Sequence, residues 1–137
     1  VRGAPTFRDI AGEFAAELAG RVFVAHNARF DFGFLSAEFR RVAPVPLGEL
    51  LLGQLCTVRL SRKLLSHLPR RNLDAVSAHY GVEIADRHRA SGDDLATAEV
   101  LRGLLCDASH RGVHTWEDLD VLLGARAKRT RSLRAFP

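Results

Sequence analysis

Hydrophobic side chains recur at intervals of three and four residues near the start of the chain, and this spacing places them on one face of a helix. The residues concerned are Phe7, Ile10, Phe14 and Leu18. Thr6 and Asp9 have the spacing of a capping box, and Gly20 suits the position after a helix end. The pattern therefore predicts a helix between Thr6 and Gly20 whose hydrophobic face is buried.

A short strand is predicted at residues 22–25, where Val, Phe, Val and Ala follow one another without a polar residue. Residues 30–42 return to helical spacing and predict a second helix. Its hydrophobic stripe consists of Phe30, Phe34, Leu35 and Phe39. We expect Phe30 and Phe34 to pack in the core, together with the leucines at residues 50–52.

Four further helices are predicted from the same spacing and from capping residues. They cover residues 58–65, 73–80, 91–108 and 116–125. Asn72 is a suitable N-cap, and Thr115 forms a second capping-box pattern with Asp118. A short apolar segment near Leu55 and Cys56 would allow a second strand.

The predicted strand at residues 22–25 raises the question of its partner, because an isolated strand leaves its backbone groups without hydrogen bonds. The strand is apolar on both faces, as is typical of a central strand. Two alternatives remain open. Either the strand pairs with the segment near Leu55 and Cys56, or most of its sheet lies outside this sequence.

Positive charge is concentrated near the end of the chain, although the net charge is only +4. The basic residues of this tail are Arg126, Lys128, Arg129, Arg131 and Arg134. The tail is interpreted either as a phosphate-binding arm for nucleic acid or as a solvated linker to another domain. We favour the linker slightly.

The composition indicates a globular protein, because 137 residues with 47% hydrophobic content suffice for one domain with its own core. No apolar run approaches the roughly 18 residues that a membrane span needs, so no membrane partner is expected. Cys56 and Cys106 lie among leucines. We interpret both as buried free thiols and expect a cytoplasmic location.

Asp31 and Asp93 are candidate metal ligands. Each is predicted in the first turn of a helix, where the helix dipole and the free N–H groups favour the ionised carboxylate. Two converging carboxylates suit Mg²⁺ or Mn²⁺, which prefer oxygen ligands. Acids in first helical turns are also common as caps, and from spacing alone this alternative is favoured.

His88 lies five residues before Asp93, on the connection that leads into the helix. A histidine there can take a proton from a water molecule beside a metal site, or it can be an ordinary surface residue. His26 follows the predicted strand directly and is expected to orient the turn. Asn27 either satisfies backbone groups of that turn or contacts substrate.

Two segments resemble motifs of one enzyme family. Residues 24–35, Val-Ala-His-Asn-Ala-Arg-Phe-Asp-Phe-Gly-Phe-Leu, resemble the second exonuclease motif of the DnaQ-like (DEDDh) 3′→5′ exonucleases. Residues 88–93, His-Arg-Ala-Ser-Gly-Asp, resemble the third motif, His-x-Ala-x-x-Asp. The family includes the epsilon proofreading subunit of bacterial DNA polymerase III. The resemblance extends from about Val1 to Cys106.

The resemblance implies an α/β, RNase H-like fold and a phosphodiesterase in which four acids hold two divalent ions, Mg²⁺ or Mn²⁺. Asp31 would be the third acid and Asp93 the last, with His88 as the general base. The substrate would be a nucleic-acid 3′ end, single-stranded DNA above all, and the product a nucleoside 5′-monophosphate. His26 and Asn27 are weaker candidates for substrate contacts. A DNA polymerase or a further fused domain is the expected protein partner.

The sequence departs from the family pattern in two places. Asp94 stands where the family has alanine, and the first motif, Asp-x-Glu on the first strand, is missing. Asp118 and Asp120 have a related spacing, but they follow the third motif and lie on a predicted helix. Because the chain also lacks methionine, we expect truncation before Val1, with most of the central sheet missing and helices dominating.

The expected organisation has three parts. Residues 1–109 would form a partial exonuclease domain, residues 110–125 a helical extension and residues 126–137 the basic tail or linker. The isolated chain should be inactive for lack of the first motif, and it should expose an unpaired strand edge. The alternative is a degenerate, non-catalytic module that binds nucleic acid or a polymerase partner.

Overall fold

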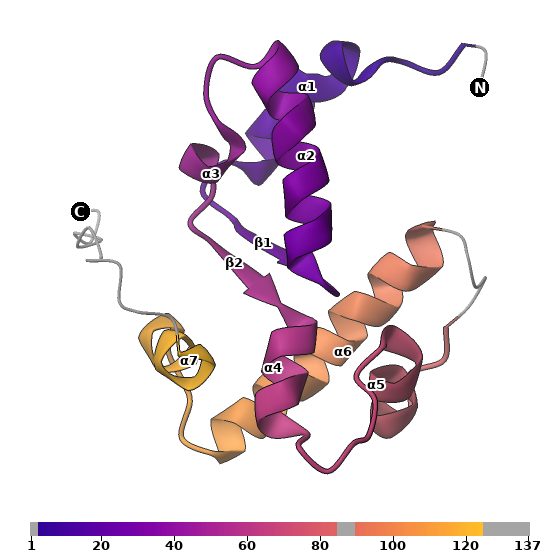
Figure 1. Ribbon diagram of the computed structural model, residues 1–137, viewed down its shortest axis with the longest axis vertical. Helices are drawn as coiled ribbons and strands as arrows, with labels where there is room; N and C mark the ends of the chain where they lie inside the picture. The colour runs from indigo at the N-terminus through magenta and orange to yellow at the C-terminus, as the bar shows by residue number, and fades with distance from the viewer. Residues whose placement is uncertain (1–2, 85–89, 125–137) are drawn as a thin grey trace.

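The computed structural model describes residues 3–84 and 90–124 of the chain (Figure 1). In chain order the elements are α1 (Phe7–Leu18), β1 (Val22–Ala25), α2 (Ala28–Val42), α3 (Leu47–Leu50), β2 (Gly53–Cys56), α4 (Thr57–Leu64), α5 (Leu73–Tyr80), α6 (Ala90–His110) and α7 (Trp116–Leu123). All the predicted helices and the predicted strand are confirmed. The short helix α3 was not predicted, and α2 begins at Ala28 because Asn27 turns the chain immediately before it.

The two strands form a parallel pair in which Val24 lies opposite Leu55 and Ala25 opposite Cys56. The first alternative for the partner of residues 22–25 is therefore confirmed. Within the part of the chain that the structure describes, the sheet consists of these two strands. This is the helix-dominated α/β arrangement that the sequence predicts.

The strand pair divides the helices into two groups (Figure 1). α1, α2 and α3 lie on one side, and α4, α5, α6 and α7 lie on the other. The main core belongs to the second group together with β2. Its buried residues are Leu55, Leu60, Leu64, Leu65, Val76, Val100, Leu104, Ala108 and Leu119.

Helices α5 and α6 pack closely because Gly103 leaves room for the ring of Tyr80. A Cβ atom at Gly103 would lie 2.6 Å from the Tyr80 ring. The Tyr80 hydroxyl donates a hydrogen bond of 2.7 Å to the carboxylate of Asp107 on α6. This contact holds the second helical group together beside its apolar core.

A smaller aromatic cluster holds the first helical group together. Phe39 of α2 is fully buried, and its ring centroid lies 5.3 Å from that of Phe7 and 6.2 Å from that of Phe14. The Phe7 and Phe39 rings meet edge to face, an arrangement that aromatic rings favour. Helix α1 is thus attached to α2 through aromatic side chains.

Several expected burials are wrong. Phe30 and Phe34 are 71% and 68% exposed, and Leu52 is 58% exposed. Ile10 and Phe14 on α1 are partly exposed, at 38% and 36%. Helical spacing places Phe30 and Phe34 on one face of α2 as predicted, but that face is open to solvent, whereas α1 packs on α2 through Phe39.

The prediction of buried thiols is also wrong for Cys106, which is exposed, whereas Cys56 is half-buried. Leu104 and Ala108 of the same helix face the core. Successive residues of a helix are about 100° apart, so Cys106, which is two residues from both Leu104 and Ala108, points away from the core. In the described ranges no helix combines the length and the apolar character needed to cross a membrane.

Candidate functional site

The carboxyl ends of β1 and β2 meet at one edge of the sheet, because the strands are parallel. His26 and Asn27 follow β1, and Thr57 follows β2. In parallel sheets this edge is where ligand-binding groups usually gather. His26 and Asn27, which belong to the segment that resembles the second exonuclease motif, therefore lie at the edge where a site is expected.

His26 joins three segments at this edge. Its Nδ1 lies 2.9 Å from the Thr57 hydroxyl, and its Nε2 lies 3.1 Å from the carbonyl oxygen of Arg71. A carbonyl only accepts, so Nε2 carries the proton, and the neutral ring then accepts at Nδ1 from Thr57. Both ring nitrogens are used within the protein, which ties β1 to α4 and to the loop before α5.

Burial lowers the pKa of His26 below its ordinary value. The hydrogen bond to the Arg71 carbonyl and the negative charge of Asp31 act in the opposite direction but are smaller effects. The ring is therefore held neutral near pH 7, in agreement with its role as acceptor for Thr57.

Asn27 turns the chain from β1 into α2. Its φ and ψ angles of 75° and 46° lie in the left-handed region, and it is the one residue other than glycine with positive φ in the described ranges. Asparagine enters this region more easily than most residues do. The Asn27 carbonyl accepts from the N–H of Phe30 at 2.9 Å, which starts the helix that carries Asp31.

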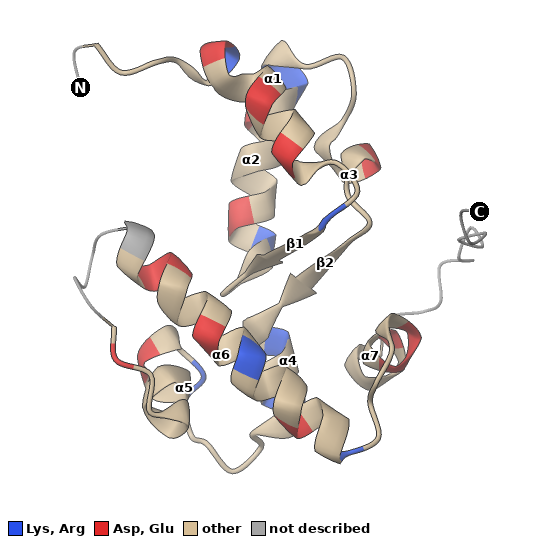
Figure 2. Ribbon diagram, turned by 180° about the vertical axis from the view of Figure 1, so that it is seen from behind, with Lys and Arg blue, Asp and Glu red and all other residues tan. Residues whose placement is uncertain are grey.

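Asp31 and Asp93 are both exposed, in the first turns of α2 and α6 respectively. Figure 2 shows acidic positions near the first turns of both helices, on the side of the molecule where β1 ends. Neither carboxylate has a hydrogen bond or an ion pair with another described residue. Asp94, next to Asp93, is exposed as well.

A shallow, open depression lies on α2 beside Asp31. It is lined by Asn27, Arg29, Phe30, Gly33 and Phe34. Sequence reasoning missed this feature because it assigned both phenylalanines to the core. The positive charge of Arg29 next to them was the one sequence signal that this face is open.

The described residues alone do not fit a metal pair. Among them, no group of three or more histidine, cysteine or acidic side chains is close enough to hold an ion. Asp118 is used elsewhere: it accepts from the N–H groups of His114 and Thr115 at 2.9 Å, and these bonds lower its pKa. This capping role agrees with the expectation that Asp118 and Asp120 do not replace the missing motif.

Several predicted site residues lie outside the described ranges. They are His88 and the tail residues Arg126, Lys128, Arg129, Arg131 and Arg134. Conversely, sequence reasoning did not identify Thr57 and Arg71 as partners of His26. They lie 31 and 45 residues further along the chain, and no local pattern relates them to it.

Comparison with known proteins identifies the family. The sequence model of the exonuclease family RNase_T matches residues 1–101. The chain belongs to this family. The resemblance to DnaQ-like exonucleases and the RNase H-like fold class are thereby confirmed, and the family generally acts on nucleic acid with divalent metals.

The chain matches a short part of each of several much longer proteins. It is 32% identical over 120 residues to a PolC-type DNA polymerase III of Staphylococcus saprophyticus, covering 88% of the chain but 8% of the polymerase. It is 38% identical over 122 residues to a putative bifunctional exonuclease/endonuclease protein of Mycobacterium tuberculosis, covering 87% of the chain and 18% of that protein. The PolC-type polymerase of Bacillus subtilis is 28% identical over 124 residues, and the chain spans 8% of its length. No solved structure matches the chain.

Proposed function

We propose that this chain is the part of a metal-dependent 3′→5′ exonuclease that contributes two acids, Asp31 and Asp93, and the general base, His88. The observation that supports this most is the placement of Asp31 at the carboxyl edge of the sheet, beside a turn fixed by His26. Membership of the exonuclease family supports the reaction class. The order and spacing of the two resembling motifs support the individual roles.

The proposed reaction is hydrolysis of the terminal phosphodiester bond. The oxygen of a water molecule attacks the phosphorus atom after His88 takes its proton, and the bond from phosphorus to the 3′ oxygen breaks. That oxygen takes up a proton and becomes the new 3′ end. A nucleoside 5′-monophosphate leaves.

The ions that we propose are two Mg²⁺ or Mn²⁺, since exposed carboxylates are ligands that these ions prefer. The described residues provide no group of three ligands. We therefore propose that the isolated chain is inactive and that further acids, in an Asp-x-Glu motif, complete the site. The chain's own contribution is positional: His26, Thr57 and Asn27 hold the start of α2, and with it Asp31.

The biological setting that we propose is DNA replication or repair in the cytoplasm, with single-stranded DNA 3′ ends as substrate and a DNA polymerase as partner or fused domain. The names of the polymerase relatives support this setting. The domain limits at residues 109 and 125 and the role of the basic tail remain predictions.

A chimera tests the proposal. A strand segment that carries an Asp-x-Glu motif is fused ahead of Val1, and the product is incubated with 5′-labelled single-stranded DNA and Mn²⁺. We expect a ladder that shortens from the 3′ end and disappears in Asp31→Asn and Asp93→Asn. The matched control is Asp94→Ala, which restores the family's residue and should retain activity.

A second candidate is the non-catalytic binding module, favoured by the lack of a three-ligand group in the described ranges. Under this alternative the chimera binds the oligonucleotide but does not shorten it. A ladder that persists in Asp93→Asn would also contradict the proposed roles.

A further inference from the structure

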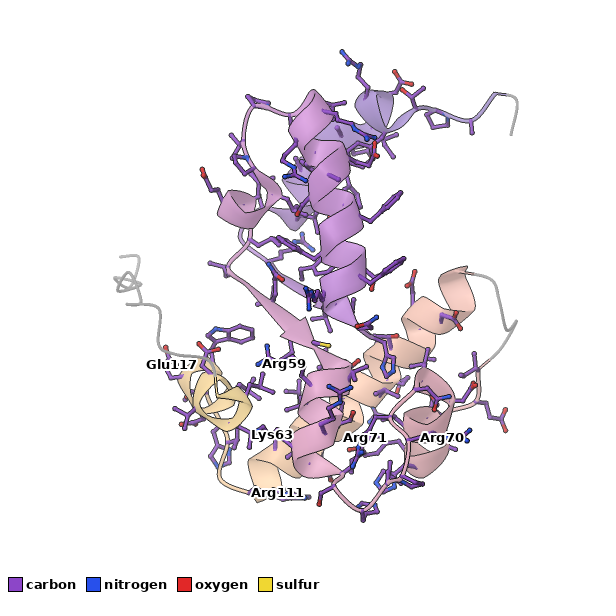
Figure 3. The ribbon with its side chains drawn as sticks, in the orientation of Figure 1. Arg59, Lys63, Arg70, Arg71, Arg111 and Glu117 are labelled. Carbon is purple, nitrogen blue, oxygen red and sulfur yellow. The ribbon has the colours of Figure 1, made fainter. Side chains whose placement is uncertain are left out.

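Positively charged residues gather outside the candidate site, on α4, on the loop before α5 and at the end of α6. Six of them, which we call the basic surface, are Arg59, Arg62, Lys63, Arg70, Arg71 and Arg111. Figure 3 labels five of them: Arg59 and Lys63 on α4, Arg70 and Arg71 on the loop that follows it, and Arg111 just after α6. No acidic residue occurs between residues 57 and 73.

Helix α4 keeps its charges on one face. Arg59, Arg62 and Lys63 are exposed, whereas Leu60 and Leu64 are fully buried in the main core. Burial of the leucines fixes the rotation of the helix, so the three cations are held toward solvent. The core packing of α4 therefore holds the backbone beneath these three cations in place.

The arginines that make hydrogen bonds do so with backbone carbonyls. Arg111 donates to the carbonyl of Leu64 at 2.6 Å, and Arg71 donates to the carbonyl of Ser66 at 2.9 Å. Arg59 donates to the carbonyl of Leu123 at 3.0 Å. A carbonyl is neutral overall, so these bonds position the guanidinium groups without cancelling their charge.

The ion pairs that join Arg21 to Glu17, Arg41 to Glu38 and Arg102 to Glu99 lie away from the basic surface. Glu117 of α7, which is also labelled in Figure 3, forms no ion pair with a residue of the described ranges. The surface thus carries a net positive charge, which Asp107, four residues before Arg111, offsets in part.

The basic surface begins next to the candidate site. Thr57, the first residue of α4, is bonded to His26 at the edge that carries Asp31. Lys63 lies six residues further on, which corresponds to about 9 Å along the helix axis.

We propose that the basic surface binds the phosphodiester backbone of nucleic acid outside the catalytic residues. The inference rests on the proposed function for the identity of the partner, because a row of exposed arginine and lysine side chains binds regularly spaced phosphates without reading bases. The surface extends the grip on the substrate beyond its terminal nucleotide. Long strands accordingly bind more tightly than short ones.

The test is fluorescence anisotropy of labelled single-stranded DNA of about 4 and about 20 nucleotides, with EDTA present and salt varied. The triple variant Arg62→Gln, Lys63→Gln, Arg70→Gln removes three charges from side chains that make no hydrogen bond to described residues. Its control, Arg40→Gln, Arg41→Gln, Arg102→Gln, removes the same number of exposed charges elsewhere, two of which are ion-paired, with Glu38 and Glu99. Both variants retain the tail, so its contribution cancels.

We expect the triple variant to lower the slope of log K against log salt for the long strand by about 2, at about 0.7 per lost phosphate contact. The control should keep the wild-type slope, and the short strand should distinguish the variants little. Equal losses in both variants, no loss in either, or failure of the chain to bind DNA would overturn the proposal. Preferential binding of an acidic polypeptide would overturn it in favour of a protein partner. Because no metal is present, the result does not depend on whether the chain hydrolyses DNA.

Discussion

His26 is a buried histidine whose neutral form is part of the structure. In the unfolded chain its pKa is about 6.5, and burial lowers it in the folded protein. Between the two values the unfolded chain binds more protons, so the free energy of unfolding rises with pH. The contribution of His26 is therefore complete above the unfolded pKa and is lost as the pH falls toward the folded pKa.

Urea unfolding between about pH 5 and about pH 8 measures this effect. We expect the stability difference between wild type and His26→Gln to be larger at the upper end of the range. The other titrating groups contribute equally to the stability of both proteins, so their contributions cancel in the difference. A difference that grows as the pH falls would mean that the charged ring is the stabilising form.

A second prediction concerns Asn27, which has a positive φ angle. Alanine and valine adopt such an angle only at a cost in free energy. We expect Asn27→Ala to destabilise the protein by about 1 kcal/mol and Asn27→Val by up to about 2 kcal/mol. Asn27→Gly should be close to neutral. Equilibrium denaturation of the three variants gives the order, and a stable Asn27→Val would show that the turn relaxes.

Local contacts were predictable from the sequence, whereas distant ones were not. Asn72 accepts from the N–H of Ala75 at 3.3 Å, and Thr115 accepts from the N–H of Asp118 at 3.1 Å, as the capping patterns predict. These contacts depend on residues three positions apart. The His26 contacts depend on where β2 and the loop before α5 fold back, which no local pattern contains.

At the scale of elements, the packing of α5 on α6 depends on the missing side chain at Gly103. We expect Gly103→Ala to destabilise the protein by about 1–3 kcal/mol, because its Cβ would overlap the Tyr80 ring. Gly12→Ala is the matched control on α1, where nothing lies within 4 Å of the new methyl group. That change should stabilise the helix by up to about 1 kcal/mol. Similar effects at both glycines would contradict the close packing.

The exposed face of α2 and the free edge of β1 predict self-association. Phe30 and Phe34 are mostly exposed, and in the described part of the chain β1 pairs with β2 on one edge alone. We expect sedimentation velocity to show mass rising with protein concentration. Phe30→Gln with Phe34→Gln should reduce it at little cost in stability, and a strictly monomeric wild type would contradict this.

At the scale of the whole molecule, helices and fold class followed from periodicity, capping and the resemblance of two motifs. The degree to which each hydrophobic side chain is buried could not be predicted from these patterns. Phe39 and Phe30 have the same helical signal, yet the first is fully buried by α1 and the second is 71% exposed. Periodicity identifies which side chains share a face, but burial depends on what lies across that face.

The same reasoning applies to the candidate site. The turn that carries Asp31 is held by three segments, and Asp93 is placed on α6, but the described residues provide no complete metal group. The central claim is that this chain holds one part of an exonuclease site. We propose that the remaining acids come from a first motif, Asp-x-Glu, which is not found in this sequence.

The most direct test is release of nucleoside 5′-monophosphate from 3′-labelled single-stranded DNA by the 137-residue chain itself, with Mn²⁺ present. The account predicts no release above the level of Asp93→Ala, while the chimera with a first motif is active under the same conditions. Robust release by the chain alone that is abolished in Asp93→Ala would contradict it.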